Sequence, residues 1–261
     1  AYDFDLDGRP LPGGTTTIPP PPGGTGSRAP RGDIGVWRQA FVDDFDTDIP
    51  LGSFPTSVSS TWSAYGPDWT DTSKRGRYSP DRVVSVSNGV LRKYLHTEAG
   101  FPRVAAITPK VPGAQELGTM YGRYEVRARF DRLPGYKVAW LLWPVSGVWP
   151  RDGEIDWPEA DLDEDRIMGF VHYQGATVGS DQAWARVDAA MTEWHTYTIE
   201  WSPHLGGFRF DGSEVLGVTE RVPNTPMRWV IQTETSLSAA PSPDVAGYVE
   251  IDWVSVWTYN P

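Results

Sequence analysis

The sequence has no cysteine among its 261 residues, which excludes disulfides and thiolate metal sites. It also has no apolar run close to the roughly 20 residues that a membrane-spanning helix needs, so we expect no membrane as a partner. Helical periodicity is missing as well, because no stretch longer than about ten residues repeats apolar side chains every 3.6 positions. These absences favour a β-rich domain.

Positive charge is scarce too. Lys and Arg number 23 against 34 Asp and Glu, which gives a formal net charge of −11. A surface of this sign repels phosphate backbones, so nucleic acid is not an expected partner. Hydrophobic residues make up 39% of the chain, enough for a folded core, and they include 13 Trp and 11 Tyr. Such rings suit both sheet packing and stacking on sugar rings.

Residues 1–36 differ from the rest of the chain. Pro, Gly and Thr dominate residues 13–24, a composition with almost nothing to bury, which is typical of an extended linker. We therefore predict an N-terminal extension over residues 1–36 and one folded domain over residues 37–261. The chain begins at Ala1 rather than Met, so we expect a processed or excised product whose linker tethers another domain. A native terminus of little structure is the alternative.

Beyond the extension, several segments follow the two-residue repeat of β-strands. Apolar and charged side chains alternate over residues 124–130 and again over residues 197–201. Asn88-Gly89 and Asp211-Gly212 each separate two such segments, as the tight turns of β-hairpins do. Residues 248–259 are apolar on both faces near their end, which predicts a central strand. Many short strands with Gly and Pro turns indicate a sandwich or a barrel.

Three acidic residues stand close together between Gly153 and Glu159. Glu154 and Asp156 are two positions apart, so on a strand they point to the same face, with Cα atoms roughly 6.6 Å apart. Glu159 has the wrong parity to join them unless one extra residue, a β-bulge, intervenes. Trp157-Pro158 occupies that place, and proline is tolerated in sheets chiefly at bulges and edges. The sequence therefore predicts three carboxylates on one face.

Carboxylates held this close repel one another, so at least one of them is expected to keep a proton near neutral pH. Glycoside hydrolysis needs that arrangement, because one ionised carboxylate and one carboxylic acid flank the scissile bond. In enzymes that retain the anomeric configuration the two groups lie about 5–5.5 Å apart, within reach of two glutamate side chains that lean together. From the spacing alone, a calcium site or a solvated acidic strand is an equal alternative.

The segment Glu154-Ile155-Asp156-Trp157-Pro158-Glu159 resembles the Glu-x-Asp-x-x-Glu signature of family 16 glycoside hydrolases in its bulged form. Other segments resemble strands of the same family, in the family's order, and the resemblance covers about residues 36–261. These segments are residues 41–45, 86–91, 121–127, 149–150, 194–201 and 249–256. The chain departs from laminarinase-like members at Trp157-Pro158, where they usually carry an aliphatic residue and Met. The bulged form argues against plant-type xyloglucan transferases.

This resemblance implies an all-β fold, a β-jelly-roll sandwich of two antiparallel sheets with a concave substrate cleft. It implies that Glu154 is the nucleophile that forms the glycosyl-enzyme. Glu159 is then the general acid that protonates the leaving oxygen and the base that later activates water. Asp156, between them, orients and tunes the nucleophile.

The same resemblance assigns four substrate-binding residues. Trp149 and Trp140 are similar to cleft or subsite residues, with core packing as the alternative for Trp140. His172 resembles a cleft histidine beside the acid, with a structural histidine as the alternative. Gln232 stands where the family often has an asparagine that contacts substrate, and its amide reaches one methylene further. Trp157 falls on the other face of its strand, so we expect it in the core.

The resemblance implies no cofactor for catalysis. Some members of the family bind a structural calcium ion on the convex side through an aspartate of the last strand. Asp252 matches that position, and calcium prefers several oxygen ligands, backbone carbonyls among them. We therefore expect at most a structural calcium ion, with Asp252 as a ligand.

Together these features predict a retaining, endo-acting hydrolase of a β-linked polysaccharide in an extracellular or cell-surface setting. A β-1,3-glucan is the first expected substrate and a galactan the second, with transglycosylation where acceptor sugars outcompete water. We expect a monomeric catalytic domain, tethered through its linker. The alternative from another class is a lectin-like carbohydrate-binding module with an inactive site, although such a module has no need of repelling acids.

Overall fold

The computed structural model describes residues 27–67 and 69–261. Most of the predicted extension, residues 1–36, lies outside this part of the chain. Its described portion, residues 27–36, contacts the folded domain: the backbone N–H of Ala29 donates to Asp44 at 2.7 Å, and the indole of Trp257 donates to the carbonyl of Gly32 at 2.9 Å. The linker and the boundary at residue 36 stay predictions.

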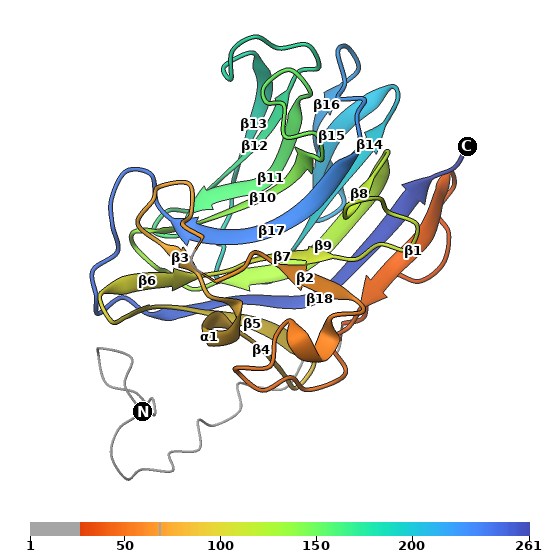
Figure 1. The fold of residues 1–261 in the computed structure, drawn as a ribbon. Helices are drawn as coiled ribbons and strands as arrows, with labels where there is room; N and C mark the ends of the chain where they lie inside the picture. Colours follow the sequence, from red (N-terminus) through yellow and green to blue (C-terminus); the bar gives the residue numbers. More distant parts are fainter. Residues whose placement is uncertain (1–26, 68) are drawn as a thin grey trace.

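Two stacked β-sheets make up the described part of the domain (Figure 1). The first sheet has ten described strands, antiparallel apart from the β3–β6 pair. In order across the sheet they are β16 (Ser213–Val218), β15 (Leu205–Phe210), β14 (His195–Ser202), β9 (Gly122–Phe130), β18 (Gly247–Tyr259), β5 (Val90–Glu98), β6 (Phe101–Val104) and β3 (Arg77–Tyr78), while β1 (Trp37–Asp43) also pairs with β18 and β4 (Val84–Ser87) with β5.

The second sheet has eight described strands and carries the acidic motif. In order they are β13 (Gln182–Asp188), β12 (Arg166–His172), β11 (Glu154–Asp161), β10 (Tyr136–Pro144), β17 (Met227–Thr235), β7 (Ala106–Pro109) and β2 (Trp62–Ala64), with β8 (Gly118–Thr119) paired to β17. Helix is confined, within the described ranges, to α1 (Pro80–Val83) and the 3₁₀ turn η1 (Thr56–Val58). Neither is long and apolar enough to cross a membrane.

The predicted hairpins and the predicted central strand are confirmed. Asn88 and Gly89 join β4 to β5 with φ of 53° and 72°, and Asp211 and Gly212 join β15 to β16 with φ of 47° and 79°. Positive φ at both turn positions matches the right-handed twist of the flanking strands, which is why Asn-Gly and Asp-Gly serve here. Residues 248–259 form most of β18, which lies between β9 and β5.

The core between the two sheets is rich in aromatic rings, and Trp140 is one of them. This side chain is fully buried and packs edge-on against Phe130 of β9 and Tyr197 of β14, at centroid distances of 5.5 and 6.0 Å. Both partners belong to the opposite sheet, so Trp140 points inward. The predicted substrate-binding role of Trp140 is therefore wrong, and the core alternative is correct. Trp157 is also buried, stacked on Phe208, as predicted.

Strand β11 carries the predicted bulge. In its pairing with β10, Asp156 lies opposite Leu141 and Glu159 lies opposite Ala139. Two residues of β11, Trp157-Pro158, therefore face a single residue of β10. This two-against-one count restores the parity of the strand, because the extra residue returns Glu159 to the face of Asp156.

Gly169 of β12 gives the bulge its room. A Cβ atom at this position would lie 2.7 Å from Cε3 of Trp157 and 2.8 Å from Cε2 of Phe208. Real Cβ atoms do not come this close to rigid rings, so only glycine lets the Trp157 ring fold over β12. The glycine on one strand and the bulge on the next are parts of one packing arrangement.

We predict that Gly169→Ala destabilises the protein by about 1–3 kcal/mol, because the ring must shift in a close-packed core. The shift reaches the bulge, so any activity that needs Glu159 in place should fall with stability. Urea unfolding and rate measurements check both effects. Gly66→Ala is the control, since an added Cβ meets nothing within 4 Å there. Equal stability of the two variants would contradict the packing account.

Candidate active site

The three predicted carboxylates share the face of the second sheet that is turned away from the core, hereafter the site face. Ala139 and Leu141, two positions apart on β10, point to the same side, and they are the partners of Glu159 and Asp156. Glu154 is two residues from Asp156 and so points the same way. Glu154 and Asp156 are buried, whereas the Glu159 side chain is 29% exposed. The sequence prediction of one acidic face is confirmed.

Burial and mutual repulsion act on the two inner carboxyls. Burial raises the pKa of Glu154 well above its usual range, and the neighbouring Asp156 charge adds to the effect. Burial likewise raises the pKa of Asp156, followed by repulsion from Glu159. The pair therefore holds on to a proton at pH values where isolated carboxyls have lost theirs.

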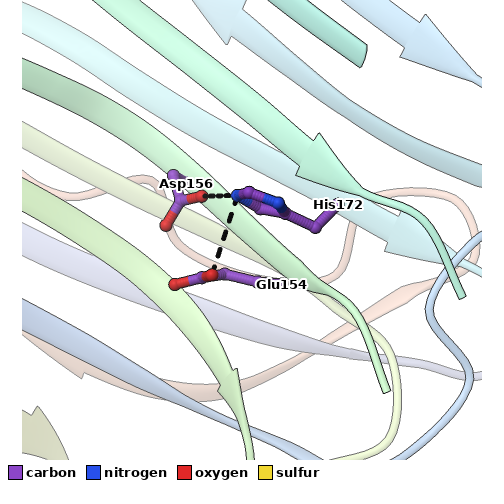
Figure 2. Close-up of side chains that lie close together, drawn as sticks. All are labelled: Glu154, Asp156 and His172. Carbon is purple, nitrogen blue, oxygen red and sulfur yellow. Dashed lines mark ion pairs between the residues drawn. The ribbon is translucent and has the colours of Figure 1, made fainter. Parts of the chain in front are cut away.

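His172 is the third member of this cluster, and Figure 2 shows its ring pointing toward both acids from one side. Its Nε2 lies 3.4 Å from Oδ2 of Asp156 and 3.7 Å from Oε2 of Glu154. Its Nδ1 lies 2.8 Å from the carbonyl oxygen of Gly179. A carbonyl oxygen only accepts, so Nδ1 carries a hydrogen. Nε2 then either donates as part of an imidazolium or accepts from a protonated carboxyl, and in both cases one proton is shared across the cluster.

A loop after β12 fixes His172 and Trp149 together. Gly179 accepts the His172 hydrogen bond, and its missing side chain leaves space for the Trp149 ring, because a Cβ there would lie 2.3 Å from that ring. Trp149 stands edge-on to His172 at 5.7 Å and stacks parallel to Trp143 at 6.5 Å. Trp149 is 42% exposed. The structure therefore brings Trp149 and His172 to the acids, as the sequence predicts.

Gln232 also lies on the site face. On β17 it stands opposite Ala139, whose other neighbour is Glu159, so the amide belongs to the same row of the sheet as the outermost acid. Its side chain is half-buried. The predicted position of Gln232 is compatible with substrate contact, and that contact stays a prediction.

Sequence reasoning missed Lys137. Its Nζ lies 2.6 Å from Oε1 of Glu159, and its side chain is only 8% exposed. Burial works to lower the pKa of Lys137, but the charge and hydrogen bond of Glu159, together with the charges of Glu234 and Asp161, outweigh it and the pKa is raised, so the amine stays cationic. One signal was available: Lys137 opens an otherwise apolar run that ends at Trp143.

Two exposed tryptophans on either side of the acids were missed as well. Trp184 of β13 is 60% exposed and pairs with Phe170, the partner of Asp156, so it lies on the site face. Trp69 is also 60% exposed, and its ring lies 5.3 Å from Tyr65, beyond β7 on the other side. A tryptophan among the polar positions of residues 182–188 was the available signal for Trp184.

Comparison with known proteins decides what this arrangement belongs to. A family model described as "Glycosyl hydrolases family 16" matches residues 115–255, more than half of the chain. The chain belongs to glycosyl hydrolase family 16. The matched segment contains the acidic motif, its bulge and His172, and the predicted family is confirmed.

Individual relatives match parts of the chain. It is 36% identical over 95 residues to a beta-glucanase from Rhodothermus marinus and 30% identical over 93 residues to a glucan endo-1,3-beta-glucosidase from Cryptopygus antarcticus. The matches cover 32% and 34% of those proteins, so the chain spans about a third of the length of the curated relatives it matches.

Solved structures of the family extend the comparison to the fold. The laminarinase from Rhodothermus marinus superposes with a TM-score of 0.70, covering 86% of this chain and 98% of that one, at 22% identity. At this identity the likeness shows the fold. The predicted all-β jelly-roll sandwich is therefore confirmed.

The calcium ion that the family resemblance implies stays a prediction, and arginines are paired with the carboxylates around its predicted ligand, Asp252. Its Oδ2 lies 2.6 Å from Nη1 of Arg127. The adjoining pocket is lined by Asp44, which pairs with Arg31, by Asp46, which pairs with Arg28, and by Asn88 and Gly89. Guanidinium groups thus hold carboxylate oxygens that a calcium ion would need, and they supply the positive charge.

We predict that calcium leaves the thermal stability of this protein unchanged. A ligand that binds only the folded state raises the Tm, so the Tm with calcium and with a chelator should agree within about 1 °C. Differential scanning calorimetry in both conditions makes the check. A calcium-dependent rise of several degrees would restore the predicted site.

Asp156→Asn should stabilise the protein at neutral pH by about 0.5–2 kcal/mol, the range typical of stabilising substitutions. The folded-state pKa of Asp156 is raised, so its ionisation opposes folding once the pH passes above the ordinary carboxyl range. The gain should shrink toward pH 4, because the folded-state acid is then neutral and the unfolded-state acid is only about half ionised.

Urea unfolding at pH 7 and pH 4 measures that difference. Glu193→Gln, at an exposed loop position, is the matched control and should change stability by less than about 0.5 kcal/mol. A loss of stability in Asp156→Asn at pH 7 would mean that the ionised carboxylate is better accommodated than its burial suggests.

Proposed function

We propose that this family 16 domain is a retaining, endo-acting hydrolase of β-glucans. The observation that carries the proposal is the shared face of Glu154, Asp156 and Glu159, which exists only because of the bulge. An inner acid near a histidine and an outer acid near a lysine have different surroundings. Different surroundings are what two carboxyls need in order to take different roles.

In the first step, the carboxylate of Glu154 attacks the anomeric carbon and forms an ester bond to it. The glycosidic C–O bond breaks at the same time, and Glu159 gives its proton to the departing oxygen. In the second step Glu159, now ionised, takes a proton from water. The water oxygen bonds to the anomeric carbon, the ester bond to Glu154 breaks, and the two inversions leave the configuration retained.

Asp156 and His172 influence whether Glu154, the proposed nucleophile, is ionised. Burial raises the pKa of both Asp156 and Glu154, so a proton is held within this pair of carboxyls. When Asp156 carries that proton, Glu154 can be ionised as the nucleophile without a second full negative charge beside it. His172, held through Gly179, approaches the same two groups from β12.

A polymeric substrate fits the exposed tryptophans on both sides of the acids. Trp184 lies two strands from β11, or about 10 Å at the usual strand spacing, and Trp69 lies on the opposite side beyond β7. Aromatic faces so placed suit sugar rings on either side of the cleaved bond. This layout supports endo-cleavage of a chain, with Trp149 and Gln232 as nearer contacts.

The names of the relatives favour β-glucan as the substrate. The matched proteins are described as beta-glucanase, glucan endo-1,3-beta-glucosidase and laminarinase. We place a β-1,3-glucan first, a galactan second, and transfer to sugar acceptors as a side reaction. Because such polymers do not cross membranes, an extracellular or cell-surface location, with a monomeric domain tethered by residues 1–36, is part of the proposal.

Product release from a panel of β-glucans and galactans tests the activity. The wild type should release oligosaccharides from β-1,3-glucan, and Glu154→Gln should lose at least about 10⁴-fold of that rate, as expected for a nucleophile. Proton NMR of the first products should show the β-anomer. Binding without products from any polymer would favour the lectin-like alternative.

Azide separates the two roles. With an activated aryl β-glycoside, Glu154→Ala should be rescued by azide to give the α-glycosyl azide, because azide replaces the nucleophile in one inversion. Glu159→Ala should instead give the β-glycosyl azide, because azide replaces water in the second of two inversions. The reverse assignment of products would exchange the roles.

A further inference from the structure

Glu159 forms an ion pair with a buried cation. Lys137 of β10 places Nζ 2.6 Å from Oε1 of Glu159, and this is the one ion pair of Glu159 in residues 27–67 and 69–261. On the β12 side, Glu159 lies opposite Met168, which offers no charge. A general acid must hold a proton in the first step, yet a cation at this distance favours the carboxylate without one. The pair therefore affects the reaction and not only the fold.

The other acidic groups around Lys137 do not form an ion pair with it. Across the strands it stands opposite Asp161 on β11 and Glu234 on β17. Oε1 of Glu234 already accepts hydrogen bonds from Tyr78 at 2.7 Å and from Thr72 at 2.8 and 3.1 Å. Within the described chain, neither Asp161 nor Glu234 comes within ion-pair distance of the amine.

The remaining charged groups near Lys137 and Glu159 line the pocket beside this ion pair. It is lined by Lys137, Glu159, Asp161, Glu164 and Arg166 together with apolar side chains. Arg166 is neutralised by Glu164, to which it is paired. Asp161 and Glu234 add negative charge near Lys137 and help keep it protonated, in line with its raised pKa. Of the cations that line this pocket, only Lys137 is paired with Glu159.

We propose that Lys137 is a positioning residue that holds Glu159 through this ion pair and sets the upper pH limit of the reaction by favouring the ionised form of the acid. The inference rests on the proposed role of Glu159 as acid and base. The first step needs Glu159 protonated, so Lys137 restricts it to lower pH. The second step needs Glu159 ionised, so Lys137 favours it. The lysine thus slows the first step at neutral pH and speeds the second step, the hydrolysis of the glycosyl-enzyme.

The test is the pH dependence of kcat/KM in the whole protein. Lys137→Met keeps the length of the side chain and removes its charge, and Lys137→Gln keeps a hydrogen-bond donor in case the first variant fails to fold. In both, the basic limb of the profile should move up by about one pH unit or more, the usual size of an opposite-charge effect on a carboxyl. Lys137→Arg should restore the wild-type limb within about 0.3 units.

Lys110→Met is the matched control, because Lys110 donates only to the backbone carbonyl of Ser59 on an exposed loop. It removes the same charge and should leave both limbs in place. A role limited to folding would lower the rate of the Lys137 variants at all pH values without moving the limb. Uncharged variants that are active and whose basic limb stays put would overturn the inference.

A titration separates this inference from the proposed function. The side-chain carboxyl carbon of Glu159, identified by its loss in Glu159→Gln, can be followed by carbon NMR in the wild type and in Lys137→Gln. Its midpoint should rise when the lysine is removed. An equal midpoint overturns the role of Lys137 even if the protein hydrolyses glucan, and a raised midpoint supports it even if no glucan is cleaved.

Discussion

The bulge in β11 is the constraint on which the site depends, because a strand alternates its side chains strictly and Glu159 would otherwise enter the core. Its formation needs partners on both neighbouring strands. On β10 one residue faces two, and on β12 Gly169 leaves room for the Trp157 ring that the bulge turns inward. Packing of Trp157 on Phe208 then ties the acidic face to the opposite sheet. Core packing and site geometry are therefore not separable here.

Charge balance is the second organising feature. Three carboxylates on one face would repel one another, and the fold places one basic side chain at each end of the row. His172 approaches the inner pair from β12 and Lys137 approaches the outer acid from β10. The inner acids, raised in pKa by burial, hold a proton, while the outer acid is paired and partly exposed. Two different environments thus arise within one strand, which suits the proposed division into nucleophile and acid.

Sequence patterns predicted the parts of this molecule that depend on neighbours along the chain. The Asn88-Gly89 and Asp211-Gly212 turns follow from local backbone preference, and the bulge follows from counting positions between Asp156 and Glu159. Trp140 was misplaced because residues 138–143 are apolar on both faces, so periodicity gives no parity there.

Interactions across strands were harder to predict. Lys137 could not be predicted from the sequence because its partner, Glu159, lies on the next strand. The register between two strands cannot be derived from either segment alone. The arginines around Asp252 are residues 28, 31 and 127, and the sequence near Asp252 contains no pattern that predicts them. The family resemblance supplied the roles of Glu154, Asp156 and Glu159, while the physical pattern supplied their common face.

Covalent trapping tests the central claim most directly, namely that the bulged strand presents Glu154 as a nucleophile with Glu159 beside it. The probe is a β-1,3-linked gluco-oligosaccharide with fluoride as the leaving group at the anomeric carbon and a second fluorine at C2. The C2 fluorine slows both steps, whereas the fluoride leaving group speeds only the first, so the glycosyl-enzyme accumulates. Peptide mass spectrometry after inactivation should find the sugar on Glu154 and on no other residue. A label on Glu159 or Asp156, or rapid turnover of natural glucan without any trapped ester, would contradict the account.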